Sequence, residues 1–372
     1  MADRALKSHP LTGTILDSLN DGLYVCNLER RITYWSKAAE RITGWSAEEI
    51  LGRRCMDDIL QHVDKDGRHL CGEEFCPLYR CMVTGQASAS PVIVFGRTRT
   101  GQRIPMTVSV APLHDGNGEV IGGVETFHDF SEAYANLERA ERIQSLSMEH
   151  DQPVDDRIRF NPFYRPHDMI GGDYFAIRRL DADRYAFFLA DVMGHGVAAA
   201  LHTMHLSSLW CRYCHELDQP ARFARSLNRE LCRIVRDESF ATALCGVLDV
   251  AARTIRFASA GGPPIVRFRP DGQAGQFAAT GLPFGMIDSA AYDEGEFRYE
   301  AGDSLLMFTD GAIEIDSADG RMLGADGLVG ILQSLGYPRA GIEMRSLEEA
   351  LLAHSNAIRL DDDLTLLEFR LL

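Results

Sequence analysis

The segment at residues 185–196 reads YAFFLADVMGHG, an apolar run joined to an acidic, glycine-rich turn. The apolar part is typical of a short buried strand, which delivers Asp191 to its end. The two glycines allow the backbone to turn sharply and to come close to a ligand. A helix is predicted to begin at Val197, and a carboxylate beside a helix start is well placed to hold a metal ion and a phosphate.

Three further acidic clusters repeat this arrangement beside apolar runs. Asp173 ends a Gly-Gly-Asp turn, Asp310 follows the run LLMFT, and Asp361, Asp362 and Asp363 precede the last apolar run. A single aspartate of this kind is usually a capping or turn residue. Buried carboxylates are costly unless they are paired or bind a cation, and sets without nearby Cys or His suit Mg²⁺ or Mn²⁺. Four such clusters together indicate a metal-dependent enzyme.

Composition sets limits on the partners and the compartment. The 372 residues are enough for two domains, and 45% hydrophobic with 25% charged residues is ordinary for a globular protein. The formal net charge of −16 argues against a nucleic-acid or anionic-membrane partner. We expect no signal peptide and no membrane insertion, because no apolar stretch is long enough. Nine cysteines, an odd number, favour reduced thiols and a cytoplasmic location.

The first part of the chain alternates short strands with turns. We predict helices at 36–43 and 46–51, each opened by a serine cap, and another at 11–19. Turn signals separate the apolar runs that we interpret as strands. The predicted strands are residues 22–28, 31–35, 91–99, 103–113 and 120–130.

Several motifs in this part resemble those of PAS sensor domains. They are DGL at 21–23, ITYWSKAAE at 32–40, TGW at 43–45 and HDFSE at 128–132. The resemblance implies a PAS domain at residues 1–130. A polar linker helix is predicted within 131–152, but its apolar positions keep no clean heptad. A solvated spacer and a stalk that joins two chains as a homodimer both remain open, and we expect a dimer through the PAS domain and this helix.

The second part combines strands in meanders with helices in blocks. This order predicts an α+β sandwich rather than a doubly wound sheet. The predicted strands are 174–180, 185–190, 241–250, 254–260, 265–269, 304–309 and 364–370. The predicted helices are 197–216, 220–237, 326–334 and 346–358.

Residues 153–372 resemble the PPM family of metal-dependent serine/threonine protein phosphatases, in the branch typified by SpoIIE and RsbU. The resemblance implies a PPM-type αββα sandwich, two antiparallel sheets flanked by helices. It rests on GGDYF at 171–175, residues 190–201, FATA at 240–243, SAGGPP at 259–264, GLPFG at 281–285, GDSL at 302–305, residues 308–314 and DDLT at 362–365.

The same resemblance implies a role for each carboxylate. Asp191 would bridge two Mn²⁺ or Mg²⁺ ions, and the carbonyl of Val192 would complete the shell of one ion. Asp310 and Asp362 would hold the other ion, with Asp363 as the alternative to Asp362. Asp173 would contact the first ion directly or through water.

Three positions near these motifs carry open questions. Family members commonly have an aspartate where this chain has Ala176, and we expect activity to survive this change. His195 lies in the turn after Asp191, where packing the turn is at least as plausible as a catalytic role. Arg165 is a candidate phosphate contact. No general acid is assigned.

The resemblance implies a PAS-regulated phosphatase that hydrolyses phosphoserine on a STAS-domain anti-anti-sigma protein. One alternative is a diguanylate cyclase, because residues 171–175 mimic its Gly-Gly-Asp-Glu-Phe signature. Tyr174 replaces the acidic residue that a cyclase needs for its metal, and a cyclase leaves Asp191, Asp310 and Asp362 unexplained. The other alternative is a catalytically silent regulator that only binds its partner. Such a protein would be expected to lose its metal carboxylates.

Four cysteines in the PAS segment form a candidate sensor site. They are Cys55, Cys71, Cys76 and Cys81, with two histidines nearby. A metal, iron–sulfur or redox centre would use them. Because no Cys-x₂-Cys pair is present, small buried thiols that pack an irregular insert remain the alternative, and the ligand of the PAS domain is unknown.

Overall fold

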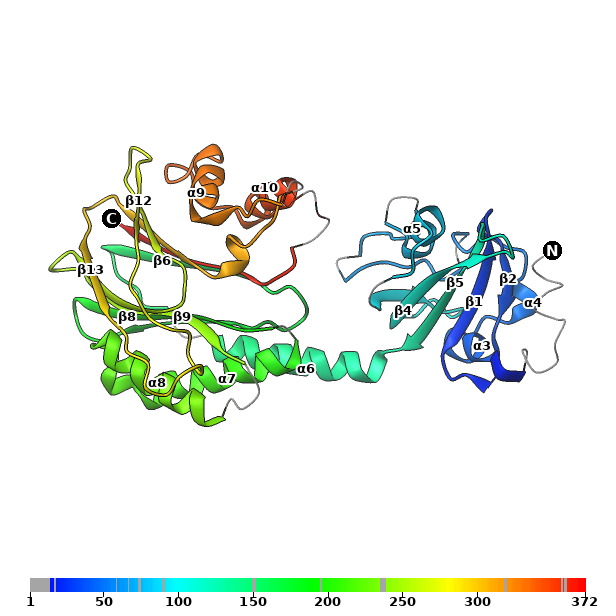
Figure 1. The fold of residues 1–372 in the computed structure, drawn as a ribbon, viewed down its shortest axis with the longest axis horizontal. Coiled ribbons are helices and arrows are strands. Elements are labelled where there is room, and N and C mark those ends of the chain that lie inside the picture. Colours follow the sequence, from blue (N-terminus) through cyan, green and yellow to red (C-terminus); the bar gives the residue numbers. More distant parts are fainter. Residues whose placement is uncertain are drawn as a thin grey trace. The chain divides into compact units, whose positions relative to one another are not determined.

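The computed structural model describes residues 14–372, except 17, 58, 66, 73–74, 89–90, 149–151, 195, 235–238, 318–319, 356 and 358–359. The chain forms two compact units, Met1–Asn136 and Leu137–Leu372 (Figure 1). Within the helix predicted at 11–19, residues 14–16 and 18 are helical, whereas 11–13 and 17 lie outside the described residues. His195 also lies outside them. Among the described helices, none combines the length and the apolar character that crossing a membrane requires.

The N-terminal unit is built on the five predicted strands, which form one antiparallel sheet in the order β2-β1-β5-β4-β3. Side chains along β4 alternate between buried and partly exposed, as a sheet with one covered face requires. The strands are β1 (Gly22–Asn27), β2 (Ile32–Trp35), β3 (Val92–Arg97), β4 (Arg103–His114) and β5 (Val120–Asp129).

Several short helices accompany this sheet. The predicted serine caps are confirmed: Ser36 caps α3 (Lys37–Thr43), and Ser46 forms a capping box at α4 (Ala47–Ile50). The third helix, α5 (Pro77–Thr84), occupies a segment that we expected to be irregular. Its proline stands at the start, where a missing N–H costs nothing.

The predicted linker helix is present as α6 (Ser131–Met148), directly after β5. Buried side chains on α6 lie only near its C-terminal end, at Gln144 and Met148. Met148 packs with the core of the C-terminal unit. The last turns of α6 therefore belong to that unit.

The C-terminal unit contains two five-stranded antiparallel sheets. The first has the order β13-β10-β9-β8-β7, with β7 (Asp173–Arg179), β8 (Arg184–Val192), β9 (Ala241–Asp249), β10 (Thr254–Ala260) and β13 (Glu294–Arg298). The second has the order β12-β11-β14-β15-β6, with β6 (Ile158–Arg165), β11 (Ile265–Phe268), β12 (Ala274–Phe277), β14 (Ser304–Phe308) and β15 (Leu364–Leu371). Strands β6, β12 and β13 were not predicted.

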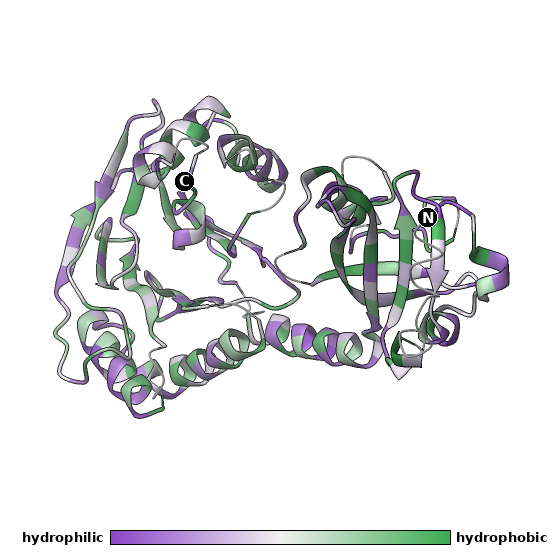
Figure 2. Cartoon of the chain, turned by 45° about the vertical axis from the view of Figure 1, so that its right-hand side comes forward, coloured by the Kyte–Doolittle hydropathy of each residue, from purple (hydrophilic) through white to green (hydrophobic). Residues whose placement is uncertain are grey.

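Helices cover the outer face of each sheet (Figure 1). The first sheet packs against α7 (Val197–Arg212) and α8 (Pro220–Ile234), and the second against α9 (Gly324–Ser334) and α10 (Met344–Ser355). Between the sheets lies a core rich in phenylalanine, including Phe187, Phe257 and Phe369. Figure 2 shows hydrophilic and hydrophobic residues along the same helices, as expected for helices with one buried face. The predicted αββα sandwich is confirmed.

Candidate active site

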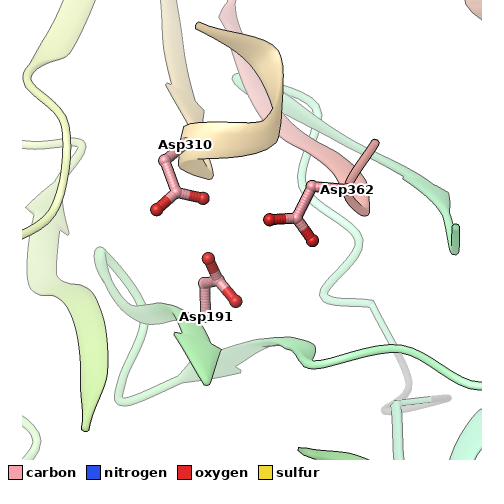
Figure 3. A group of neighbouring side chains, drawn as sticks. All are labelled: Asp191, Asp310 and Asp362. Atoms are coloured by element: carbon pink, nitrogen blue, oxygen red, sulfur yellow. The ribbon is translucent and has the colours of Figure 1, made fainter. Parts of the chain in front are cut away.

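Three aspartates from separate elements meet at one place in the C-terminal unit (Figure 3). Asp191 lies near the end of β8 in the first sheet. Asp310 opens η2 (Asp310–Ala312) after β14, and Asp362 precedes β15, both in the second sheet. One carboxylate oxygen from each lies within 4.8 Å of the others. The site therefore joins the two layers of the sandwich.

The cluster carries more negative charge than its surroundings offset. Burial, followed by repulsion from Asp173, raises the pKa of Asp191 to about 11. Burial also raises the pKa of Asp362, with Asp310 among the repelling groups. One buried oxygen of Asp310, Oδ1, has no hydrogen-bond partner among the described residues. Carboxylates this close resist ionisation unless a cation offsets their charge, so the set fits a hard divalent ion.

Asp173 lies beside the cluster and is held by two threonines. It stands opposite Asp191 in the register of β7 and β8. Its Oδ2 accepts hydrogen bonds from the hydroxyl of Thr309, at 2.8 Å, and from that of Thr365. Its Oδ1 is buried and has no partner in the described part of the chain. One oxygen is thus fixed by the protein, and the other is left for a ligand.

Asp363 has a different position from Asp362. Its carboxylate accepts the backbone N–H of His167, at 2.6 Å, and that of Gly172, at 2.5 Å. These bonds fasten the turn before β7 to the start of β15. Asp362 shares the cluster with Asp191, whereas Asp363 organises the backbone behind it.

Backbone segments approach closely at the base of the site. A Cβ on Gly311 would lie 2.0 Å from the carbonyl oxygen of Asp363, so no larger residue fits there without movement. The N–H of Val192 donates to the carbonyl of Gly172 at 3.0 Å. A Cβ on Gly172 would lie 2.7 Å from the carbonyl oxygen of Val192. The glycines of the motifs therefore permit the contacts that bring the carboxylates together.

Gln144 connects α6 to this site and was not predicted. Its side-chain amide donates to the carbonyl of Gly171 at 2.7 Å and to the hydroxyl of Thr203 at 2.9 Å. It also accepts the N–H of Gly171 at 3.2 Å. One buried side chain thus joins the linker helix, the turn before Asp173 and helix α7. A glutamine in a polar helix is too common to be noticed in a single sequence.

Two residues questioned from the sequence, Ala176 and Arg165, have different surroundings. Ala176 is buried with the core residues under α7. Because it is three residues from Asp173 on one strand, it lies on the opposite face of β7. The side chain of Arg165 lies 3.7 Å from Glu348. Glu314, which was not singled out, lies close enough to Asp310 and Asp362 for their charges to contribute to its raised pKa, after burial.

The candidate sensor cysteines are only partly brought together. Cys55 and Cys76 both contact the Arg30 guanidinium, and the sulfur of Cys71 accepts the N–H of His62 at 3.2 Å. The thiol of Cys26, which was not predicted, is hydrogen-bonded to Cys55. Burial alone raises the pKa of Cys81, with no contribution from the other thiols.

Comparison with known proteins identifies both parts of the chain. The family described as stage II sporulation protein E matches residues 181–372, and the family described as PAS fold matches residues 16–135. The match with the second family agrees with the PAS resemblance of the N-terminal sheet.

Two curated relatives come from Bacillus subtilis (strain 168). The chain is 29% identical to phosphoserine phosphatase RsbP over 182 residues, which is 48% of this chain and 45% of RsbP. It is 23% identical to phosphoserine phosphatase RsbU over 240 residues, 64% of this chain and 71% of RsbU. The aligned part thus spans less than half of RsbP.

A solved structure shares the fold of the C-terminal unit. The SiaA-PP2C domain of Pseudomonas aeruginosa superposes with a TM-score of 0.56 at 20% identity. The superposition covers 64% of this chain and 96% of that domain.

Proposed function

The chain belongs to the stage II sporulation protein E family, and on that premise we propose that it is a metal-dependent serine/threonine protein phosphatase. The cluster of Asp191, Asp310 and Asp362 carries this proposal, because it presents crowded carboxylates that fit divalent cations. The relatives RsbP and RsbU, both named phosphoserine phosphatases, support it. The family assignment leaves the cyclase alternative without support.

Two Mn²⁺ or Mg²⁺ ions would be held by the chain's own oxygen atoms. Asp191 would serve both ions, the carbonyl of Val192 and Asp173 would serve the first, and Asp310 and Asp362 the second. Such a pair of ions acidifies a water molecule and offsets the charge on a phosphoryl group.

The surrounding residues fix the carboxylates before substrate arrives. Thr309 and Thr365 hold one oxygen of Asp173, so its other oxygen keeps a fixed direction. Asp363 binds the backbone of the turn at Gly172, which faces Val192. A site fixed in this way does not need to reorganise during the reaction.

The substrate that we propose is a phosphoserine on a small STAS-domain anti-anti-sigma protein, as in partner-switching signalling. The names of RsbP and RsbU support phosphoserine as the chemical group. The strongly acidic chain offers no general attraction for phosphate, so recognition would depend on the ions and on contacts with the protein partner.

We propose that the PAS domain controls the site through α6. Gln144 holds both the turn before Asp173 and helix α7, which begins just after the Asp191 turn. A shift of α6 would therefore move the backbone behind two carboxylates. Exposed apolar side chains on the same helix, Ile143 and Leu146, support a homodimer through the PAS domain and α6. Replacing both with glutamate should lower the mass measured by light scattering from dimer to monomer.

The test of the phosphatase proposal is phosphate release from a phosphorylated STAS protein with Mn²⁺ or Mg²⁺. The wild type should release phosphate only with a divalent ion, and Asp191→Ala should not. Asp271→Ala, which removes an exposed aspartate of the β11–β12 turn, is the matched control and should behave as wild type. Binding of the STAS protein without any release by the wild type would favour the silent regulator instead.

A further inference from the structure

Arg30 holds a guanidinium group inside the N-terminal unit at a conformational cost. Its φ of 62° is in the left-handed region, which costs a residue other than glycine about 1 kcal/mol. Only 6% of the residue is exposed. Nη1 donates to the carbonyl of Gly72 at 3.3 Å, and Nη2 to the sulfur of Cys76 at 3.6 Å. Such a conformation persists where the surroundings impose it, often for a functional reason.

Two cysteine side chains that interact with each other lie beside this cation. Cys26 is on β1 and fully buried, whereas Cys55 is in the turn after α4 and only partly buried. The two side chains are hydrogen-bonded to each other, and Cys55 is also hydrogen-bonded to the Arg30 guanidinium. The backbone N–H of Cys55 donates to the carbonyl of Arg30 at 2.9 Å. The pair is therefore held in place from both sides.

This arrangement divides the roles of the two sulfur atoms. The hydrogen bond from Cys26, and then Arg30, lower the pKa of the Cys55 thiol to about 7 against the opposing effect of burial. The same hydrogen bond raises the pKa of Cys26. Near neutral pH, Cys55 thus has thiolate character, and Cys26 keeps its proton and donates it to the hydrogen bond. A partly exposed thiolate beside a cation is the environment of a reactive cysteine.

The other thiols of this unit do not combine exposure with a neighbouring cation, since Cys76 contacts Arg30 but is buried. Burial raises the pKa of Cys71 to about 12, and it also raises the pKa values of Cys76 and Cys81. Within the described residues of this unit, no three Cys, His, Asp or Glu ligand atoms come close enough to hold a metal ion. A guanidinium group among the sulfur atoms also opposes a second cation. The geometry therefore favours thiol chemistry over metal binding.

We propose that Cys55 and Cys26 are a site of reversible oxidation, where a hydroperoxide converts the pair into a disulfide. The Cys55 thiolate attacks the terminal peroxide oxygen, a sulfur–oxygen bond forms, and the oxygen–oxygen bond breaks. The leaving hydroxide or alkoxide takes a proton from water. The Cys26 sulfur then attacks the Cys55 sulfenic acid, the disulfide forms, and water leaves with the Cys26 proton.

The disulfide would covalently connect β1 to the turn that carries Cys55, which are now joined by noncovalent contacts. Cys26 stands opposite Gly123 in the register of β1 and β5, and β5 leads directly into α6. The turn that carries Cys55 lies beside β2, where Arg54 pairs with Arg31. Oxidation would thus tie the strand next to β5 to a surface turn.

The experiment is peptide mass spectrometry of the full-length protein under non-reducing conditions. Protein reduced and purified without oxygen is treated with an equimolar amount of hydrogen peroxide, and the remaining thiols are then alkylated. We expect one dominant cross-link, between the peptides of Cys26 and Cys55, which disappears after dithiothreitol. A different dominant cross-link, no loss of thiols, or metal released in proportion to the thiols would overturn the proposal.

Three variants separate the roles of the two sulfur atoms. Cys26→Ser should stop at a Cys55 sulfenic acid, which dimedone traps, and Cys55→Ser should lose peroxide reactivity in this unit. Cys81→Ser, the matched buried control, should cross-link as the wild type does. If Cys55→Ser consumed peroxide at the rate of the wild type, the assignment of the reactive thiol would be wrong. The wild-type cross-link map decides the proposal even if a serine variant fails to fold.

Discussion

The two units accommodate acidic groups in opposite ways. In the N-terminal unit the buried acid Glu125 lies near Tyr24 and 3.8 Å from His62. Burial raises the pKa of Glu125 to about 8 and lowers that of His62 to about 4, so both are neutral near pH 6.5. In the C-terminal unit, Asp191, Asp310 and Asp362 share one site. One buried acid is tolerated by keeping its proton, whereas a crowded set acquires a function by binding cations.

The largest expected effect tests whether crowding defines the C-terminal site. Asp191→Asn should lower metal-dependent hydrolysis at least about a hundredfold, because several kcal/mol of charge stabilisation are lost. In ion-free buffer the same change should raise the free energy of unfolding by about 1–2 kcal/mol, because the fold no longer bears the cost of keeping this carboxyl protonated. Activity assays and urea unfolding in EDTA measure the two effects. Asp271→Ala, the exposed control in the β11–β12 turn, should change neither by a comparable amount.

The second prediction tests the close backbone contact behind the carboxylates. Gly311→Ala places a Cβ 2.0 Å from the carbonyl oxygen of Asp363. We expect a loss of about 1–3 kcal/mol in the free energy of unfolding, with weaker metal binding. Gly330→Ala, in helix α9 with open space at its Cβ, is the control and should be neutral or stabilising. Equal stability of the two variants would refute the close contact.

The third prediction concerns the connection between α6 and the site. Gln144→Ala leaves both backbone groups of Gly171 without their partner, and about 1–3 kcal/mol of stability should be lost. Turnover should fall about tenfold, because the turn that carries Asp173 loses its support. Gln333→Ala removes an exposed bond from a glutamine to a backbone carbonyl, and it should have little effect. Unchanged turnover in Gln144→Ala would argue against control through α6.

The last prediction concerns the neutral acid. A carboxyl whose folded-state pKa is raised contributes stability below its unfolded pKa, and this contribution is lost as the pH rises through the folded value. The stability of Glu125→Gln relative to the wild type should therefore increase from pH 5 to pH 8, by at most about 1.4 kcal/mol per pH unit.

His62 and Cys55 have lowered pKa values, so their titration stabilises the fold as the pH rises, opposite to the effect of Glu125. Both proteins contain these two residues, so comparing them at each pH removes this contribution. Amide hydrogen exchange of β5 in the full chain measures this local stability. A difference that does not change with pH would show that Glu125 is ionised in the fold.

Much of the fold followed from hydrophobic periodicity and turn residues, because these act locally. The strand from Thr254 to Ala260 was predicted with its observed bounds. Edge strand β6 was missed because Pro162 interrupts its pattern, and proline is tolerated at an edge. Helix α5 was missed because glycine and proline around the cysteines indicate irregular structure.

The candidate site was also predictable only where local sequence patterns determine it. The positions of Asp191, Asp310 and Asp362 at strand ends beside glycines predicted them as site residues. The threonines that hold Asp173 depend on contacts across 136 and 192 residues of sequence, which no local pattern contains. The pairing of Cys26 with Cys55 is equally non-local, since β1 has to fold against the turn after α4.

Calorimetric titration of the ion-free full-length protein with Mn²⁺ tests the central claim most directly. The account predicts uptake of two ions per chain by the wild type, and loss of that uptake in Asp191→Asn at the same concentrations. Absence of binding to the wild type, or equally tight binding to Asp191→Asn, would contradict the assignment of this carboxylate cluster as a two-metal centre.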